Sequence, residues 1–247
     1  MRNSWTVRLT LGLLGVTALL LADETVKPPV QATSTDHLDF APGGVIRVNG
    51  SYDDLYIEGW DQSQVEMSVT KFMPFNYEPG HPERAAQHLS AVGMVAQRRS
   101  PSELEISVNL PHRGGPPLWP HTTKGSVRLE CHLHVPRNSR LVIRHGVGLV
   151  SVTGVSGDID ARCHRGDIVL WLPEGGTYSI EAKNKLGKVS SDYAGASSSQ
   201  FLVGQKFVSA NPAATQRLYL RMGFGGITLK PILPESEPEK PAQPGVK

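Results

Sequence analysis

The sequence predicts an all-β fold, a parallel β-helix or solenoid-like stack of short strands with a small helical insertion. Glycines recur every nine residues in the middle of the chain, at Gly148, Gly157, Gly166 and Gly175. Apolar residues lie two and four positions after most of these glycines, which is the pattern of a strand with one buried face. A unit of about nine residues cannot bury that face alone, so such units must stack. An antiparallel β-sandwich is the alternative, because turns about every 8–12 residues are typical of it too.

Residues 1–22 have the pattern of a signal peptide. Arg2 and Arg8 precede an uncharged, largely apolar run from Leu9 to Ala22, and two acidic residues follow it. This run is shorter than the roughly 20 residues that a membrane-spanning helix needs. We therefore expect cleavage after Ala22, no transmembrane anchor in the mature chain, and a location in the periplasm, at the cell surface or outside the cell. Residues 23–36 are expected to form a linker.

The folded domain is expected to span residues 37–232 and to begin with two strands. Gly44 is followed by apolar residues at positions 46 and 48, and Asp53 by apolar residues at positions 55 and 57. An insertion at about residues 73–124 then interrupts the pattern. Within it, His81–Val92 has an early proline followed by helix formers, which predicts a short helix. Glu103–Asn109 alternates like a strand, and a long loop rich in Pro and Gly follows.

The strands that follow the insertion are expected to form the core. Period-two alternation assigns their inward positions, which include Val150, Val152, Ile159, Ala161, Ile168, Leu170, Ile227 and Leu229. Gly, Asp and Asn at the strand boundaries supply the backbone conformations that tight turns need. Residues 233–247 are rich in Pro, Glu and Lys, so we expect a disordered tail there.

Three stretches of strand and turn cover most of residues 40–230: GGVIRVNGSYDDLYIEGWDQSQVEMSVTK, RLVIRHGVGLVSVTGVSGDIDARCHRGDIVLWLP and LYLRMGFGGITL. They resemble the putative-adhesin family of secreted bacterial proteins. This resemblance implies β-solenoid repeats, and the family, whose members are mostly of unknown function, has no established catalytic residues to carry over. The chain departs from the family pattern at Gly148-Leu149, where a Gly-Asp or Gly-Asn turn is typical.

The charge balance bears on the class of partner. The chain has 25 basic and 23 acidic residues, and the predicted signal peptide holds two of the basic ones and none of the acidic ones. The mature chain is therefore formally neutral. A protein that binds nucleic acid or an anionic membrane usually has a basic patch or stripe, and the sequence has no basic run of any length. We expect a protein or glycan partner and no nucleic acid.

Motifs for catalysis, cofactors or metals are absent from the sequence. A dinucleotide fingerprint starting at Gly146 needs a glycine where Ser151 stands, and no GxSxG, HExxH or CxxC motif is present. The turn aspartates do not repeat as calcium-binding repeats do. His132 and His134 share the outward face of one strand, yet a zinc site needs three or four protein ligands. The sequence therefore predicts no catalytic, cofactor-binding or metal-binding residues.

Both cysteines of the chain, Cys131 and Cys163, occupy inward positions of their strands. In an exported protein they are candidates for a disulfide, which would stabilise the fold by roughly 3–4 kcal/mol. Two buried free thiols that fill small gaps in the core are the alternative.

The candidate partner-binding face comprises outward residues of the central repeats: Asp158, Asp160, Arg162, Val169 and Trp171. Exposed aromatic patches are typical of interaction sites, whereas a strand that is apolar on both faces can also be covered by other parts of the protein. The sequence thus favours a non-enzymatic, adhesin-like binding or structural module of the cell envelope. The alternative is a polysaccharide lyase or hydrolase that uses the outward acids, with Glu181 beside Asp158 and Asp160.

Overall fold

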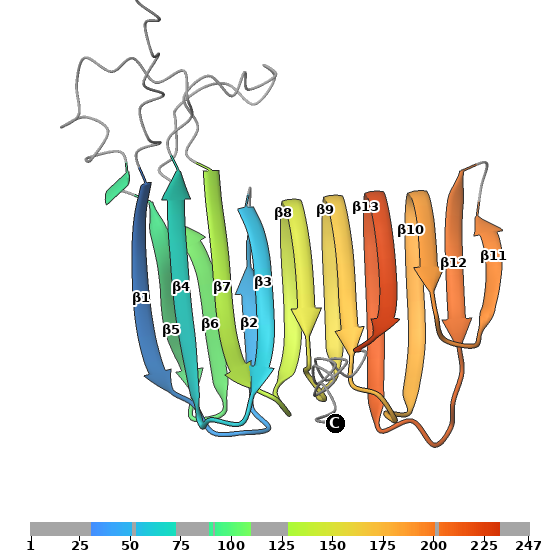
Figure 1. Ribbon diagram of the computed structural model, residues 1–247, viewed down its shortest axis with the longest axis horizontal. Helices are drawn as coiled ribbons and strands as arrows, with labels where there is room; N and C mark the ends of the chain where they lie inside the picture. Colours follow the sequence, from blue (N-terminus) through green and yellow to red (C-terminus); the bar gives the residue numbers. More distant parts are fainter. Residues whose placement is uncertain are drawn as a thin grey trace, which may run out of the picture.

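The computed structural model describes residues 31–50, 53–72, 89–90, 92–109, 128–200 and 203–232 (Figure 1). Most of these residues lie in one 13-stranded sheet, so the all-β prediction is confirmed. The predicted signal peptide, most of the predicted helix and the predicted tail lie outside the described residues. Of the predicted helix, Leu89 and Ser90 are described and are helical.

The strands follow one another along the chain with few interruptions. They are β1 (Gln31–Asp39), β2 (Val45–Asn49), β3 (Asp53–Trp60), β4 (Gln64–Phe72), β5 (Gly93–Ser100), β6 (Glu103–Asn109), β7 (Arg128–Pro136), β8 (Arg140–Thr153), β9 (Ile159–Leu172), β10 (Tyr178–Ser191), β11 (Ala196–Gln200), β12 (Gly204–Ser209) and β13 (Gln216–Pro231). β1 begins inside the expected linker, 23–36. Its exposed residues lack the apolar alternation of a core strand, and it joins the sheet by antiparallel pairing with β4.

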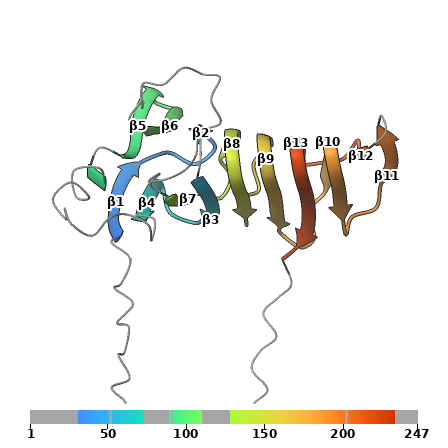
Figure 2. The ribbon, with the colours of Figure 1, turned by 90° about the horizontal axis from the view of Figure 1, so that it is seen from above.

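The long strands bend in the middle, and this bend divides the sheet into two layers. The first half of β8 pairs with β2, whereas its second half pairs with β3. One layer, which we call the upstream layer, consists of β5, β6, β2, β12, β11 and the first halves of β8, β9, β13 and β10. The downstream layer consists of β1, β4, β7, β3 and the second halves of the same four strands. Seen from above, β5, β6 and β2 lie apart from β1, β4, β7 and β3 (Figure 2).

Parallel pairing holds the middle of the sheet together. β8, β9, β13 and β10 are adjacent in this order, and each pairs with the next in parallel. Parallel stacking is what a solenoid requires, although β13, the last strand of the described residues, lies between β9 and β10 instead of at the end of the stack. Antiparallel pairs form the edges of the sheet, namely β1 with β4, β5 with β6, and β12 with β11.

A ladder of four glycines forms the bend, with one glycine on each long strand. Gly148, Gly166, Gly225 and Gly187 are paired in register, and their φ angles lie between 127° and 136°. Residues other than glycine rarely adopt this backbone conformation. A Cβ on any of them would also overlap the backbone of the neighbouring strand. Two of the four repeat glycines therefore lie inside strands, at the bend, rather than in the turns expected from the sequence.

The core lies between the two layers, as the period-two pattern predicts. All eight of the assigned inward residues named above are buried, with exposed fractions of 1% or less. Gly157 and Gly175 lie in the turns at the edge opposite the glycine ladder, and Gly175 has a φ of 80°. The nine-residue period thus alternates between bend and turn, so that two periods make one circuit of both layers.

Candidate functional site

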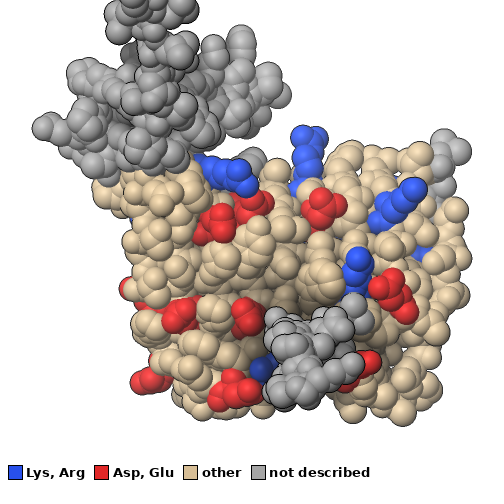
Figure 3. Space-filling model, viewed as in Figure 1, with Lys and Arg blue, Asp and Glu red and all other residues tan. Residues whose placement is uncertain are grey.

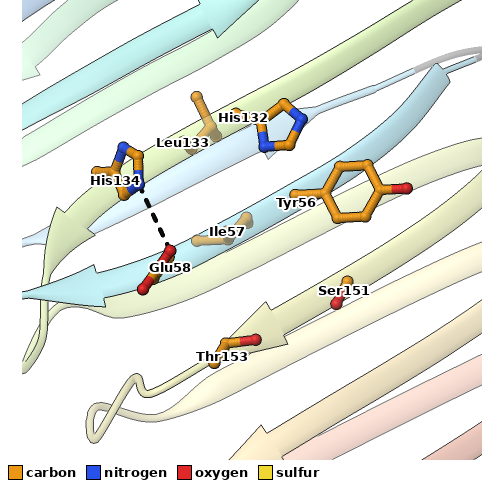
Figure 4. A pocket seen from close by; sticks show the side chains of 8 residues that line it. All are labelled: Tyr56, Ile57, Glu58, His132, Leu133, His134, Ser151 and Thr153. Atoms are coloured by element: carbon orange, nitrogen blue, oxygen red, sulfur yellow. Dashed lines mark ion pairs between the residues drawn. The ribbon is translucent and has the colours of Figure 1, made fainter.

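A pocket of about 230 Å³ lies on the outer face of the downstream layer. Its lining comes from three neighbouring strands, β7, β3 and β8. We call it the outer groove, and its lining residues are Tyr56, Ile57, Glu58, His132, Leu133, His134, Ser151 and Thr153 (Figure 4).

Cross-strand pairing of aromatic rings builds one wall of the outer groove. Tyr56 on β3 is in register with His132 on β7, and their rings stack with centroids 4.7 Å apart. Trp60 stacks on His134, which lies diagonally across from it, with centroids 5.1 Å apart. Directly opposed side chains on a sheet face come within contact distance, and diagonal neighbours are within reach of aromatic side chains. The parallel register of β3 and β7 therefore fixes both ring pairs in place.

Carboxylates surround the histidines of the groove. The Nδ1 atom of His134 lies 2.9 Å from a carboxylate oxygen of Glu66, and its Nε2 atom lies 3.5 Å from Glu58. Figure 4 shows Glu58 reaching across from β3 toward His134. Glu130 hydrogen-bonds with Nε2 of His132 at 2.8 Å. Acidic side chains outnumber basic ones on this half of the face, over β1, β4, β7 and β3 (Figure 3).

The Tyr56 hydroxyl is held in its protonated form. Burial raises the pKa of this phenol, and the negative charges of Asp54 and Glu130 raise it further. The hydroxyl can therefore donate a hydrogen bond at any physiological pH. The groove combines aromatic rings, carboxylate acceptors and hydroxyl groups, which together can recognise a polar ligand that has an apolar face.

The predicted partner-binding face does not form one surface. Val169 and Trp171 lie on the outer face of the downstream layer, beside the groove, because they pair with Ser151 and Thr153. Trp171 is half-buried, and the ammonium of Lys230 lies 5.6 Å from the centre of its ring.

The remaining residues of that predicted face lie elsewhere. Asp160 and Arg162 precede Gly166 on β9 and therefore lie on the outer face of the upstream layer. Asp158 is in the preceding turn, where its carboxylate accepts a hydrogen bond from the backbone N–H of Arg217. The sequence pattern carries a sign of this separation, because the buried positions of β9 are odd-numbered up to Cys163 and even-numbered from Ile168, a shift of one residue at the bend.

The two cysteines are buried free thiols. Cys131 lies on β7 and Cys163 on β9, and β3 and β8 separate these strands in the sheet. Three strand spacings of about 4.8 Å place the two cysteines far beyond the roughly 7 Å Cα separation that a disulfide tolerates. The structure thus has the second arrangement considered above, and the Cys131–Cys163 bond is not formed.

Of the acids considered for an enzyme, Asp160 and Glu181 are paired with cations, whereas Asp158 accepts a hydrogen bond from a backbone N–H. Asp160 accepts hydrogen bonds from the guanidinium of Arg144 at 2.9 and 3.1 Å. Lys183 donates to Glu181 at 2.7 Å, and this hydrogen bond lowers the pKa of the Glu181 carboxyl. A glycosidase general acid needs a raised pKa, so Glu181 is poorly suited to that role.

Metal-binding clusters and membrane-spanning helices are both absent from the described residues. No three side chains among His, Cys, Asp and Glu are placed there to share a metal ion. No helix of the described part of the chain is long and apolar enough to cross a membrane.

Sequence reasoning missed the aromatic and acidic residues of the groove on β3. The outward side chains of β3 alternate with the inward Leu55 and Ile57, and they are Tyr56, Glu58 and Trp60. Alternation in the segment LYIEGW would have placed them on one exposed face. The pairing of this face with the histidines of β7 depends on a register that the sequence does not specify.

The chain matches no protein-family model and no curated protein. It is similar in structure to a putative cell adhesion protein of Clostridium sporogenes, with 11% identity and a TM-score of 0.49 over 83% of this chain and 100% of that one. A putative adhesin of Parabacteroides distasonis gives 10% identity and a TM-score of 0.29 over 81% and 65% of the two chains. A putative adhesin of Bacteroides fragilis gives 9% identity and a TM-score of 0.26 over 81% and 97%.

Proposed function

We propose that this protein is an exported, non-enzymatic binding module of the cell envelope, and that its outer groove binds a glycan. The observation that carries the proposal is the pair of ring stacks, Tyr56 with His132 and Trp60 with His134, set beside carboxylates on a rigid sheet. The apolar face of a sugar ring packs well on aromatic side chains. Carboxylates such as Glu58 accept hydrogen bonds from sugar hydroxyls.

The charge of the groove narrows the class of glycan. Glu58, Glu66 and Glu130 surround the two histidines, and all three carboxylates lie near the ring stacks. A negatively charged ligand would be repelled at this face, because like charges at short range are unfavourable. The groove is therefore suited to a neutral or amino sugar. Trp171, on the next strand of the same face, extends the aromatic surface toward β13.

Export rests on the first 22 residues, whose basic start and short apolar run are typical of a cleaved signal peptide. A display role also agrees with the architecture. Stacked strands hold outward side chains at fixed spacings, so a ligand meets a preorganised surface and little conformational entropy is lost on binding.

A glycan array probed with the purified protein tests the groove. We expect retention on neutral or amino-sugar glycans, and at least about a tenfold loss of affinity for the Tyr56→Ala variant, because an aromatic anchor of a binding site carries much of its energy. Phe224→Ala is the matched control. Phe224 is 41% exposed and lies outside the groove, so its removal is expected to leave glycan affinity unchanged. No retained glycan, or equal losses in the two variants, would refute the proposal.

A further inference from the structure

Five basic side chains occupy one register position across five neighbouring strands of the upstream layer. Arg144 on β8 pairs with Arg162 on β9, and Arg162 pairs with Arg221 on β13. Arg221 pairs with Lys183 on β10, and Lys183 pairs with Lys206 on β12. All five side chains lie on the outer face, and none is fully buried. We call this row the cation ladder.

Such a row costs stability by itself. Neighbouring strands are about 4.8 Å apart, and like charges directly opposite each other destabilise a sheet. Two carboxylates relieve part of this repulsion. Asp160 binds Arg144 and lies 3.6 Å from Arg162, and Glu181 binds Lys183.

At the other end of the ladder, Glu181 interacts with Arg221 and Lys206 only through its charge. Within the described part of the chain, neither Arg221 nor Lys206 has a carboxylate within salt-bridge distance. An excess of positive charge therefore remains along the row, and an anionic ligand would compensate for it.

A hollow of about 570 Å³ borders the ladder on the side of the bend. Arg144, Arg162 and Arg221 line it together with Lys185, and no acidic residue contributes to its lining. Tyr219 fixes two of the guanidinium groups, which lie 4.4 Å (Arg221) and 6.0 Å (Arg162) from the centre of its ring. The cations are thus partly preorganised, and planar guanidinium groups match the geometry of carboxylates.

We propose that the cation ladder binds a linear, carboxylated polysaccharide, a polyuronate, which lies across the strands along the row. Successive strands present one cation each, and a polyuronate carries one carboxylate on each sugar. One sugar residue of an extended chain is close in length to the strand spacing of about 4.8 Å. Carboxylates of the polyuronate that face the sheet can therefore lie near successive cations of the row. This site lies on the other layer from the outer groove and does not depend on the function proposed for the groove.

Nucleic acid fits this surface less well than a polyuronate. Proteins that bind single strands combine basic grooves with aromatic rings on which bases stack. Here Tyr219 lies beside the row, and Arg221 lies over its ring. A duplex reader needs an element that enters a groove of the helix, whereas the ladder lies on the face of a sheet.

Binding to immobilised polygalacturonate, measured over a range of NaCl concentrations, tests the proposal. We expect the parent protein to bind and its affinity to fall steeply with salt, because each ion pair releases counterions. The Arg221→Gln/Lys206→Gln variant removes the two cations of the ladder that form no salt bridge within the described residues. We expect it to lose at least about tenfold in affinity.

The matched control is Lys188→Gln/Lys230→Gln. These two exposed lysines lie on β10 and β13 after the bend, on the outer face of the other layer. The control removes two positive charges, as the ladder variant does. If binding depends on the cations of the ladder rather than on net charge, the affinity of the control is expected to stay within about twofold of the parent. Thermal unfolding midpoints within a few degrees of the parent establish that both variants fold.

Three results would overturn the proposal. The first is no binding of the parent protein to polygalacturonate at low salt. The second is an equal loss of affinity in the ladder variant and the control, which would indicate nonspecific attraction. The third is tighter binding to single-stranded DNA than to polygalacturonate at the same salt concentration, which would assign the ladder to nucleic acid. The groove proposal is unaffected by any of these results, because it is tested with uncharged and amino sugars.

Discussion

At the four glycines of the bend, the backbone of each strand packs directly against the backbone of its neighbour. This contact leaves no room for a side chain, so only glycine fits at these positions. In Gly166 both constraints act together: its φ is 127°, and a Cβ would overlap the carbonyl oxygen of Gly148. A shift of one strand to relieve the overlap would move its neighbours as well, since Gly225 contacts Gly166 in the same way. A substitution at any of the four glycines is therefore expected to destabilise the bend.

The Gly166→Ala substitution is expected to lower the free energy of unfolding by about 2–4 kcal/mol, through backbone strain and steric overlap. Gly93→Ala is the control, because a Cβ at Gly93 meets no atom within 4 Å. Urea unfolding of both variants measures the effect, and the control is expected to stay within about 0.5 kcal/mol of the parent. Similar unfolding midpoints for both variants would argue against the packed ladder.

Burial also governs the chemistry of the two thiols. It raises the pKa of the Cys163 thiol to about 11 and raises the pKa of Cys131 well above its usual range. The thiolate is the reactive form, so both cysteines should be inert in the folded protein. At pH 8 about one Cys163 thiol in a thousand would be ionised.

We expect a thiol reagent such as Ellman's reagent to leave the native protein unmodified over minutes at pH 8. After unfolding in guanidinium without reductant, both of the two cysteines should react. Detection of no free thiol in the unfolded protein would instead indicate the Cys131–Cys163 disulfide. Rapid reaction of the native protein would contradict the buried positions of the thiols.

Single elements differ in how much of their structure could be predicted from sequence. Along β9, alternation correctly assigned Ile159, Ala161, Ile168 and Leu170 to the core, because a strand with one buried face must alternate. The bend at Gly166 is visible in the same pattern as a shift of one residue, because the buried positions are odd-numbered up to Cys163 and even-numbered from Ile168. β1 was missed altogether: backbone pairing with β4 secures it, and its side chains are mostly exposed.

The candidate surfaces were less predictable than the core because they depend on register between distant strands. Arg144 and Arg221 are far apart in sequence, yet both are neighbours of Arg162 in the sheet. The absence of a basic run therefore says nothing about a basic row that crosses the strands. A search for like charges at equivalent positions of successive repeats would have aligned Arg144 with Arg162, since each precedes a ladder glycine by four residues.

At the scale of the whole molecule, the order of strands makes the last one indispensable. β13 lies between β9 and β10 and pairs with both over most of its length. Its inward side chains, among them Leu218, Leu220 and Leu229, belong to the common core. Without β13 the sheet would be cut in its middle, with two long unpaired edges.

A chain that ends at Thr215 is therefore expected not to fold cooperatively, because both unpaired edges and the core would be exposed. A chain that ends at Ile232 retains every described strand and serves as the control. Circular dichroism during thermal unfolding measures both. A cooperative transition in the shorter chain, at the midpoint of the control, would contradict the central role of β13.

The position of β13 also has a consequence for when the protein can acquire its structure. A chain made from its amino end presents β9 and β10 long before the strand that joins them exists. Contacts between segments so distant along the chain form slowly. The sheet thus stays incomplete until the residues of β13, Gln216–Pro231, have emerged, and this late strand then joins the two halves.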